Sequence, residues 1–173
     1  MRARADLWVL RSAACALALA LASGAAVALD AASPSSPVDL TRTLVDLNGQ
    51  YHAASATARP EILRELLRVA AERQKALAAL MQTDPGAVLR AALPAGLRAS
   101  FPPEVRPYVE EEVELEGVVE VLHEDRDAGS RYLYFLETGG QRYTLHFASD
   151  APALLTGTRL RVKGVRVGLD VAL

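Results

Sequence analysis

The stretch "EEVELEGVVEVLHE", residues 111–124, decides the fold because its side chains alternate between two kinds. Aliphatic residues share the odd positions, at Val113, Leu115, Val119 and Val121, and carboxylates share the even ones, at Glu112, Glu114, Glu116 and Glu120. A period of two is that of a β-strand with one buried face and one face in water. Gly117 lies in the middle, where a strand bends or forms a bulge. The sequence therefore predicts a long, half-buried strand that begins at residue 111.

Four more strands are predicted after this one. Turn-forming residues at 125–130 and a Gly-Gly pair at 139–140 separate segments with strand composition, and a connection with one helical turn precedes the fourth strand. The expected strands cover residues 131–138, 141–148, 158–167 and 169–173. Closing such a sheet removes its unpaired edges. We therefore predict that residues 111–173 form a small five-stranded OB-like antiparallel β-barrel.

Residues 60–110 are predicted to be a helical segment. Pro60 suits the first turn of a helix, and an apolar stripe then recurs at steps of three and four residues, at Ile62, Leu63, Leu66, Leu67, Ala70, Leu77, Leu80 and Met81. This helix should span about 23 residues, or roughly 35 Å. Asp84 and Pro85 predict the start of a second helix that ends near Leu93. The prolines that follow predict a broken chain with one helical turn, so the fold class is α+β with the helices first.

Residues 29–59 are predicted to be a flexible leader with a weak helix. The run "DAASPSSP" at 30–37 is small, polar and proline-containing, as is typical of a flexible segment. Leucine and valine then recur over residues 40–47, and Asn48 with Gly49 is expected to end that helix.

Residues 1–28 are predicted to be a signal peptide. Three arginines precede an apolar run, and Ala26-Val27-Ala28 places small residues where a signal peptidase cleaves. A retained membrane anchor is the alternative, but it needs about 20 apolar residues, and this run is shorter and rich in alanine and serine. The protein is therefore expected to be secreted or periplasmic, with membrane contact only during export. Cys15, the only cysteine, lies inside this segment, so the mature chain should have neither a disulfide nor a thiolate metal site.

Charge argues against a nucleic-acid partner. The whole chain has 19 Lys and Arg against 21 Asp and Glu, a net charge of −2. The predicted signal peptide removes three of those cations and one of those anions, so the exported chain is more acidic still. Proteins that bind nucleic acid usually carry a basic surface instead.

The strongest candidate site is the cationic fourth strand, "TRLRVKGVRV". Arg159, Arg161 and Lys163 share one face there, and Tyr132 and Tyr134 of the second strand could add aromatic contacts to a small or anionic ligand. The alternative, which we favour, is that the three cations pair with Glu112, Glu114 and Glu116 across strands.

The residues predict no catalytic, metal or cofactor site. His123-Glu124-Asp125 begins like the H-E-x-x-H zinc motif, but Asp127 stands where the second histidine would be. His123 and His146 could hold a metal weakly if they met across strands, but solvated histidines at strand ends are the expectation.

Three runs carry a resemblance to a known family: "ELLRVAAERQKALAALMQTDPGAVLRAALP", "FPPEVRPYVEEEVELEGVVEVLHEDR" and "YTLHFASDAPALLTGTRLRVKGVRVG". Together they resemble the N-terminal module of secreted bacterial proteins, several of which continue into a gametolysin-like zinc metallopeptidase domain. The resemblance covers about residues 60–173 and includes no catalytic helix with metal-binding histidines. It implies an accessory or propeptide-like module and assigns no catalytic residue.

Three functions follow as hypotheses. The first is an exported, non-catalytic interaction or propeptide-like module, with a secreted peptidase as its partner. The second is a periplasmic OB-like barrel that binds a small or anionic ligand through its fourth strand. The third is an enzyme fragment whose active domain is lost or encoded separately.

Overall fold

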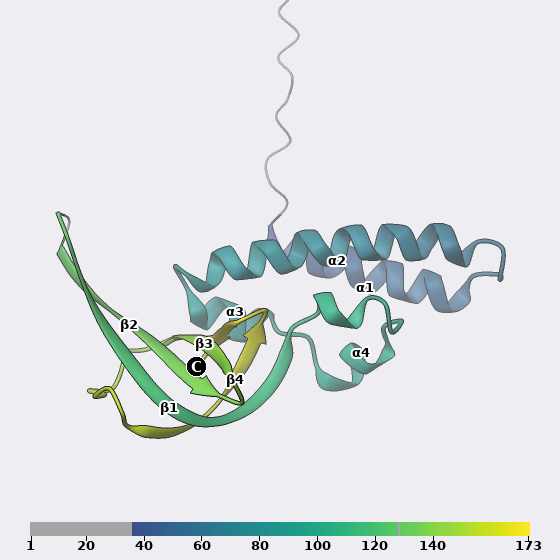
Figure 1. Ribbon diagram of the computed structural model, residues 1–173. Coiled ribbons are helices and arrows are strands. Elements are labelled where there is room, and N and C mark those ends of the chain that lie inside the picture. Colours follow the sequence, from purple (N-terminus) through teal and green to yellow (C-terminus); the bar gives the residue numbers. More distant parts are fainter. Residues whose placement is uncertain (1–35, 128) are drawn as a thin grey trace, which may run out of the picture. The chain divides into compact units, whose positions relative to one another are not determined.

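The structure, a computed structural model, describes residues 36–127 and 129–173. Helices come first along the chain and a five-stranded mixed sheet follows, so the predicted α+β class is confirmed (Figure 1). The predicted signal peptide, residues 1–28, and the leader as far as residue 35 lie outside the described residues. Among the described helices, none combines the length and hydropathy that a membrane span requires.

Helix α1, Pro37–Ala53, is much longer than the weak helix that the sequence predicts. Ser36 caps its first turn by accepting a hydrogen bond from the Asp39 N–H, and Pro37 occupies the first helical position. A glycine within a helix costs only about 1 kcal/mol. The helix therefore continues through Gly49, because Leu44 is fully buried and Asn48 donates a 2.9 Å hydrogen bond to Ser100.

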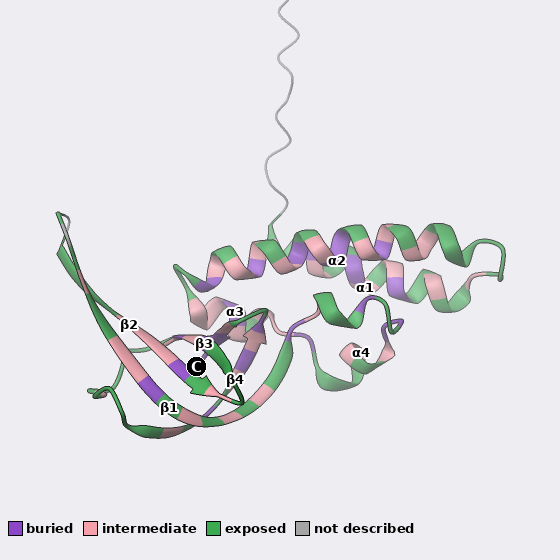
Figure 2. Cartoon of the chain, viewed as in Figure 1, coloured by how far each residue is buried: buried purple, intermediate pink, exposed green. Residues whose placement is uncertain are grey.

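Helix α2, Arg59–Met81, confirms the predicted 23-residue helix, and it packs beside α1 (Figures 1 and 2). Helix α3, Pro85–Ala91, starts as predicted, with the Asp84 side chain accepting from the Ala87 N–H. Helix α4, Ala95–Ser100, lies in a stretch that the sequence predicts to be broken. The single turn expected near residues 104–108 is the 3-10 helix η1, Arg106–Tyr108.

The sheet closes on itself. Its strands are β1 (Glu111–Arg126), β2 (Gly129–Thr138), β3 (Gln141–His146), β4 (Arg159–Val167) and β5 (Asp170–Ala172). They pair in the order β1-β2-β3-β5-β4, and β4 returns to β1. The first half of β1 pairs with β4 and the second half with β2, and the two ladders meet at Val118. The 16-residue length of β1 is what lets one strand serve both neighbours.

The antiparallel sheet predicted from the sequence is wrong in one pairing. Strands β3 and β5 run parallel, with Leu145 opposite Val171. After β3, the chain makes a long connection and then forms β4, which runs antiparallel to β5. Strand β5 therefore starts at the same end of the sheet as β3 and runs parallel to it. The connection before β4 contains no helical turn, contrary to the prediction.

Two glycines allow the close approach of strands in this sheet. A Cβ atom at Gly117 would lie 2.3 Å from the carbonyl oxygen of Glu137, and one at Gly164 would lie 2.1 Å from that of Ala172. Real Cβ atoms do not come so near a carbonyl oxygen, so only glycine fits. The predicted bend or bulge position at Gly117 is thus a point where β1 and β2 backbones nearly touch.

The core has three parts. Inside the closed sheet lie the odd positions of β1 with their partners, with Val119, Leu136, Tyr143, Leu145, Val162 and Val171 buried. Outside it, β4 and β5 pack against α2 and α3 through Val165, Val167, Ala172, Leu77, Met81 and Val88. The third part joins α1, α2 and the α4 region around Leu44, Leu66 and Phe101. The C-terminal part of α2 therefore packs on the sheet.

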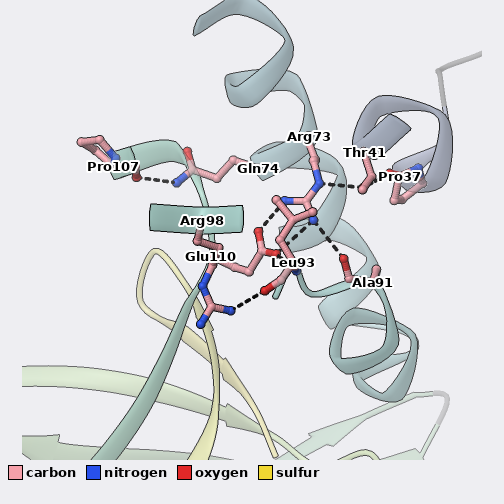
Figure 3. A network of polar contacts seen from close by, with 9 residues as sticks. All are labelled: Pro37, Thr41, Arg73, Gln74, Ala91, Leu93, Arg98, Pro107 and Glu110. Atoms are coloured by element: carbon pink, nitrogen blue, oxygen red, sulfur yellow. Dashed lines mark hydrogen bonds and ion pairs between the residues drawn. The ribbon is translucent and has the colours of Figure 1, made fainter. Parts of the chain in front are cut away.

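A buried ion pair joins the helices to the start of β1 (Figure 3). The guanidinium of Arg73 binds both carboxylate oxygens of Glu110, and both side chains are almost fully buried. Arg73 also donates to the Thr41 hydroxyl at 2.7 Å and to the Ala91 carbonyl at 3.0 Å. Glu110 also accepts from the Leu93 N–H at 2.5 Å. This network fixes α1, α2, the chain after α3 and β1 relative to one another.

Candidate functional site

The cations of β4 lie opposite the glutamates of β1. Arg161 donates to Glu116 at 2.7 Å, and Lys163 lies 3.2 Å from Glu114. Arg159 is more exposed and reaches Glu116 only at 3.9 Å. The structure thus supports the cross-strand pairing that we favoured over a free cationic face.

Glu112 does not take part in this pairing. It lies opposite Val165 of β4, and its carboxylate is 3.3 Å from Arg98 of α4 instead. The prediction that Glu112 faces the cations of β4 is wrong, because this row of cations ends at Lys163 and the next residue on the same face is Val165.

The hydrogen bond between Arg161 and Glu116 lowers the pKa of the Glu116 carboxyl below its ordinary value, and the positive charge of Arg161 adds to the effect. The same contact raises the pKa of Arg161. Both side chains stay ionised at neutral pH, so their charges largely cancel at the surface.

The two tyrosines named from the sequence make other contacts. Tyr132 is 59% exposed and stacks on His123, with ring centroids 4.8 Å apart. Tyr134 is half-buried and meets Phe147 edge to face at 5.2 Å.

The structure does not bring the five predicted site residues into one site. Tyr132 and Tyr134 lie opposite odd positions of β1, whereas Arg161 and Lys163 lie opposite even positions. Successive side chains of a strand point to opposite faces. The aromatic and cationic residues therefore occupy opposite faces of the sheet.

The two strand histidines are also apart. His146 lies on the outer face of β3 and pairs with Asp170 at 2.8 Å. Its side chain is only 12% exposed, so the expectation of a solvated histidine is wrong at this position. His123 stacks on Tyr132 on the opposite face of the sheet. Within residues 36–127 and 129–173, no group of three or more His, Cys, Asp or Glu side chains is placed to hold a metal ion.

A two-stranded arm is the feature that the residue patterns did not predict. Beyond Val121, β1 pairs with β2 alone, and β2 pairs with β3 only from Tyr134 onward. We name residues 122–127 and 129–133 the β1–β2 arm, whose strands project beyond the others in Figure 1. The sequence signal for the arm was the length of the first strand. This strand, with 16 residues, is much longer than β3, with 6, so part of it extends past the rest of the sheet.

The arm carries apolar side chains on both faces. Leu122 is 41% exposed and lies opposite Leu133 on one face, while the His123–Tyr132 stack occupies the other. An ion pair of 2.7 Å between Arg131 and Glu124 lies beside the two leucines. The arm therefore presents apolar groups next to charged groups. None of the other described strands pairs with its backbone edges.

Comparison with known protein families, with curated proteins and with solved structures finds no match for this chain.

Proposed function

We propose that the chain is an exported, non-catalytic interaction module that binds a protein partner through the β1–β2 arm. The observation that carries this proposal is the arm itself, with Leu122 and Tyr132 exposed on its two faces. A two-stranded hairpin without a third strand is marginally stable in water. A partner that covered the apolar side chains would stabilise the arm and bury surface that water now contacts.

The backbone edges of the arm suggest how the partner binds. An exposed edge accepts an extended segment of another chain by strand addition, in which main-chain hydrogen bonds give affinity. Side chains such as Leu122 and Leu133 would then select apolar residues of that segment. The resemblance to modules of secreted metallopeptidases favours an extended segment of a secreted peptidase as the partner, and export of the chain is part of the same proposal.

The arrangement of strands supports the assignment of an OB-like barrel. The sheet closes in the order β1-β2-β3-β5-β4, as expected for a five-stranded Greek-key barrel of this kind. In OB-folds the connection between the first two strands forms part of the binding surface. The β1–β2 arm occupies that place in the chain.

The test is capture of partners from the exported fraction with the full chain as bait. The variant Leu122→Asp with Tyr132→Ser should lose a partner that the wild type retains, and Arg161→Gln, on the other part of the sheet, should retain it. Hydrogen exchange should then show slower exchange of the arm amides in the complex. A partner that both variants bind equally, or protection confined to residues outside the arm, would overturn the proposal.

Ligand binding through β4 is the weaker candidate, because an anion there must displace glutamates that already pair with Arg161 and Lys163. Under that function, Arg161→Glu would abolish anion binding by the full chain, and the arm variant would not change it.

A further inference from the structure

A cleft of about 520 Å³ lies where the helices meet the sheet, away from the arm. Its lining includes Gln74 of α2, Arg98 of α4, Arg106 of η1, Glu111 of β1 and Arg166 of β4. The volume is within the range of pockets that bind small molecules. Three of these five side chains are arginines, so the cleft is rich in cationic hydrogen-bond donors.

Arg98 and Arg106 are held in place by backbone carbonyls. Arg106 donates to the carbonyls of Phe101 and Ala99, each at 2.9 Å, and Arg98 donates to that of Leu93 at 2.7 Å. Figure 3 shows Arg98 bonded to Leu93 beside the buried Glu110. A carbonyl oxygen orients a guanidinium but carries no net charge, so these contacts position the arginines without neutralising them.

The carboxylates nearby do not compensate both arginines. Glu110 is taken up by Arg73, and Glu111 lies 2.5 Å from Arg166. Glu112 is 3.3 Å from Arg98, but its carboxylate is 66% exposed. Among the described residues, Arg106 has no ion pair within 4.0 Å, so a positive charge remains at the cleft.

We propose that this cleft binds a small oxyanion, a carboxylate or phosphate group, with Arg106 as its main donor and Arg98, which also pairs with Glu112, as a second donor. A guanidinium has five N–H groups, and Arg106 uses two of them for carbonyls. The remaining donors match the paired oxygens of a carboxylate or phosphate. Because carbonyls already fix both side chains, an anion would lose little affinity to their ordering. This site is separate from the arm and does not depend on the proposed function.

The experiment titrates the full chain with inorganic phosphate and, separately, with succinate, by calorimetry at constant ionic strength. Wild type should bind at least one of the two saturably, and the one it binds identifies the group. Arg106→Gln should weaken binding about tenfold or more, as loss of a charge-assisted hydrogen bond implies. Arg106→Lys keeps the charge but loses the fork, and should weaken binding to an intermediate degree.

Arg161→Gln is the matched control, since it removes the same charge outside the cleft. It should leave the dissociation constant unchanged. Circular dichroism and the unfolding midpoint check that each variant folds. If Arg106→Gln does not fold, Arg106→Lys takes its place in the binding comparison. The proposal fails if wild type binds neither anion, or if Arg161→Gln weakens binding as much as a substitution at Arg106.

Discussion

The same ion pair, an arginine with a glutamate, occurs in two settings in this molecule. Arg73 and Glu110 meet between the helices and the sheet, where their side chains are 1% and 0% exposed. Arg161 and Glu116 meet on the outer face of the sheet, where they are 65% and 44% exposed. The first pair has three further partners on two other segments of the chain, whereas the second is part of a row of charges along two neighbouring strands.

The difference shows that burial decides what an ion pair does. A buried pair has lost its hydration and gains little net stability over apolar residues, but removing one partner leaves an unpaired charge in the interior. The buried pair therefore holds the helices and the start of β1 in one arrangement. An exposed pair remains hydrated and screened by salt, so it contributes little on its own. Here it places opposite charges side by side in water on the outer face of β1 and β4.

Removing one member of the buried pair should have the largest effect. Arg73→Met would leave Glu110 buried without its cation, and the free energy of unfolding should fall by about 3–5 kcal/mol. Urea denaturation of the full chain measures this value.

Adding Glu110→Gln to Arg73→Met is the informative second step. The glutamine is uncharged and its carbonyl can still accept from the Leu93 N–H, so the double variant should recover part of the lost stability. A double variant that is less stable than Arg73→Met by the full cost of a second deletion would contradict the account of the pair as one unit.

A substitution that leaves both ion pairs intact should have an intermediate effect. In Gly117→Ala the added methyl group would press against the Glu137 carbonyl, so the free energy of unfolding should fall by about 1–3 kcal/mol. Gly49→Ala in α1, where a Cβ would contact nothing within 4 Å, is the control and should raise stability by about 0.5–1 kcal/mol. Equal effects of the two alanines would show that the strands do not approach closely at Gly117.

The exposed pair should give the smallest effect, and one that depends on pH. The pKa of Glu116 is lowered in the folded chain, so its contribution is present above the pKa of the unfolded chain and is lost as pH falls through the folded value. Glu116→Gln should therefore reduce the slight loss of stability between about pH 5 and pH 3. Thermal unfolding across that range measures it, with Glu104→Gln as the control. An unchanged pH profile would mean that the pair does not form in solution.

The sequence predicted the elements whose patterns are local. The alternation from residue 111 and the stripe of α2 each repeat many times, so the long strand and the long helix follow from them. Helix α1 was underestimated because its stability comes from distant contacts, such as the one between Asn48 and Ser100, which outweigh the glycine inside it. The parallel pairing of β3 with β5 also depends on the path of the whole chain and leaves no local trace.

The candidate sites were harder to predict for the same reason. Arg73 falls within the apolar stripe of α2, and a charged residue at such a position is the signal that could have identified the buried pair. Glu110 is one of several consecutive glutamates, so nothing in the sequence distinguishes it. Arg98 and Arg106 lie in a proline-rich stretch without periodicity, and only the folded chain brings them to one cleft.

The division of β1 between two neighbours also has a consequence for how quickly the chain can fold. Its ladder with β2 begins at Arg126 and Gly129, which are near neighbours in the chain, and hairpins of this kind form within microseconds. Its ladder with β4 joins residues 41 to 55 positions apart, from Val118 with Arg159 to Glu111 with Arg166, and so carries the entropy cost of a long loop. High contact order slows folding. The rate at which the native chain forms should thus be governed by the arrival of β4, on which the docking surface for α2 and α3 also depends.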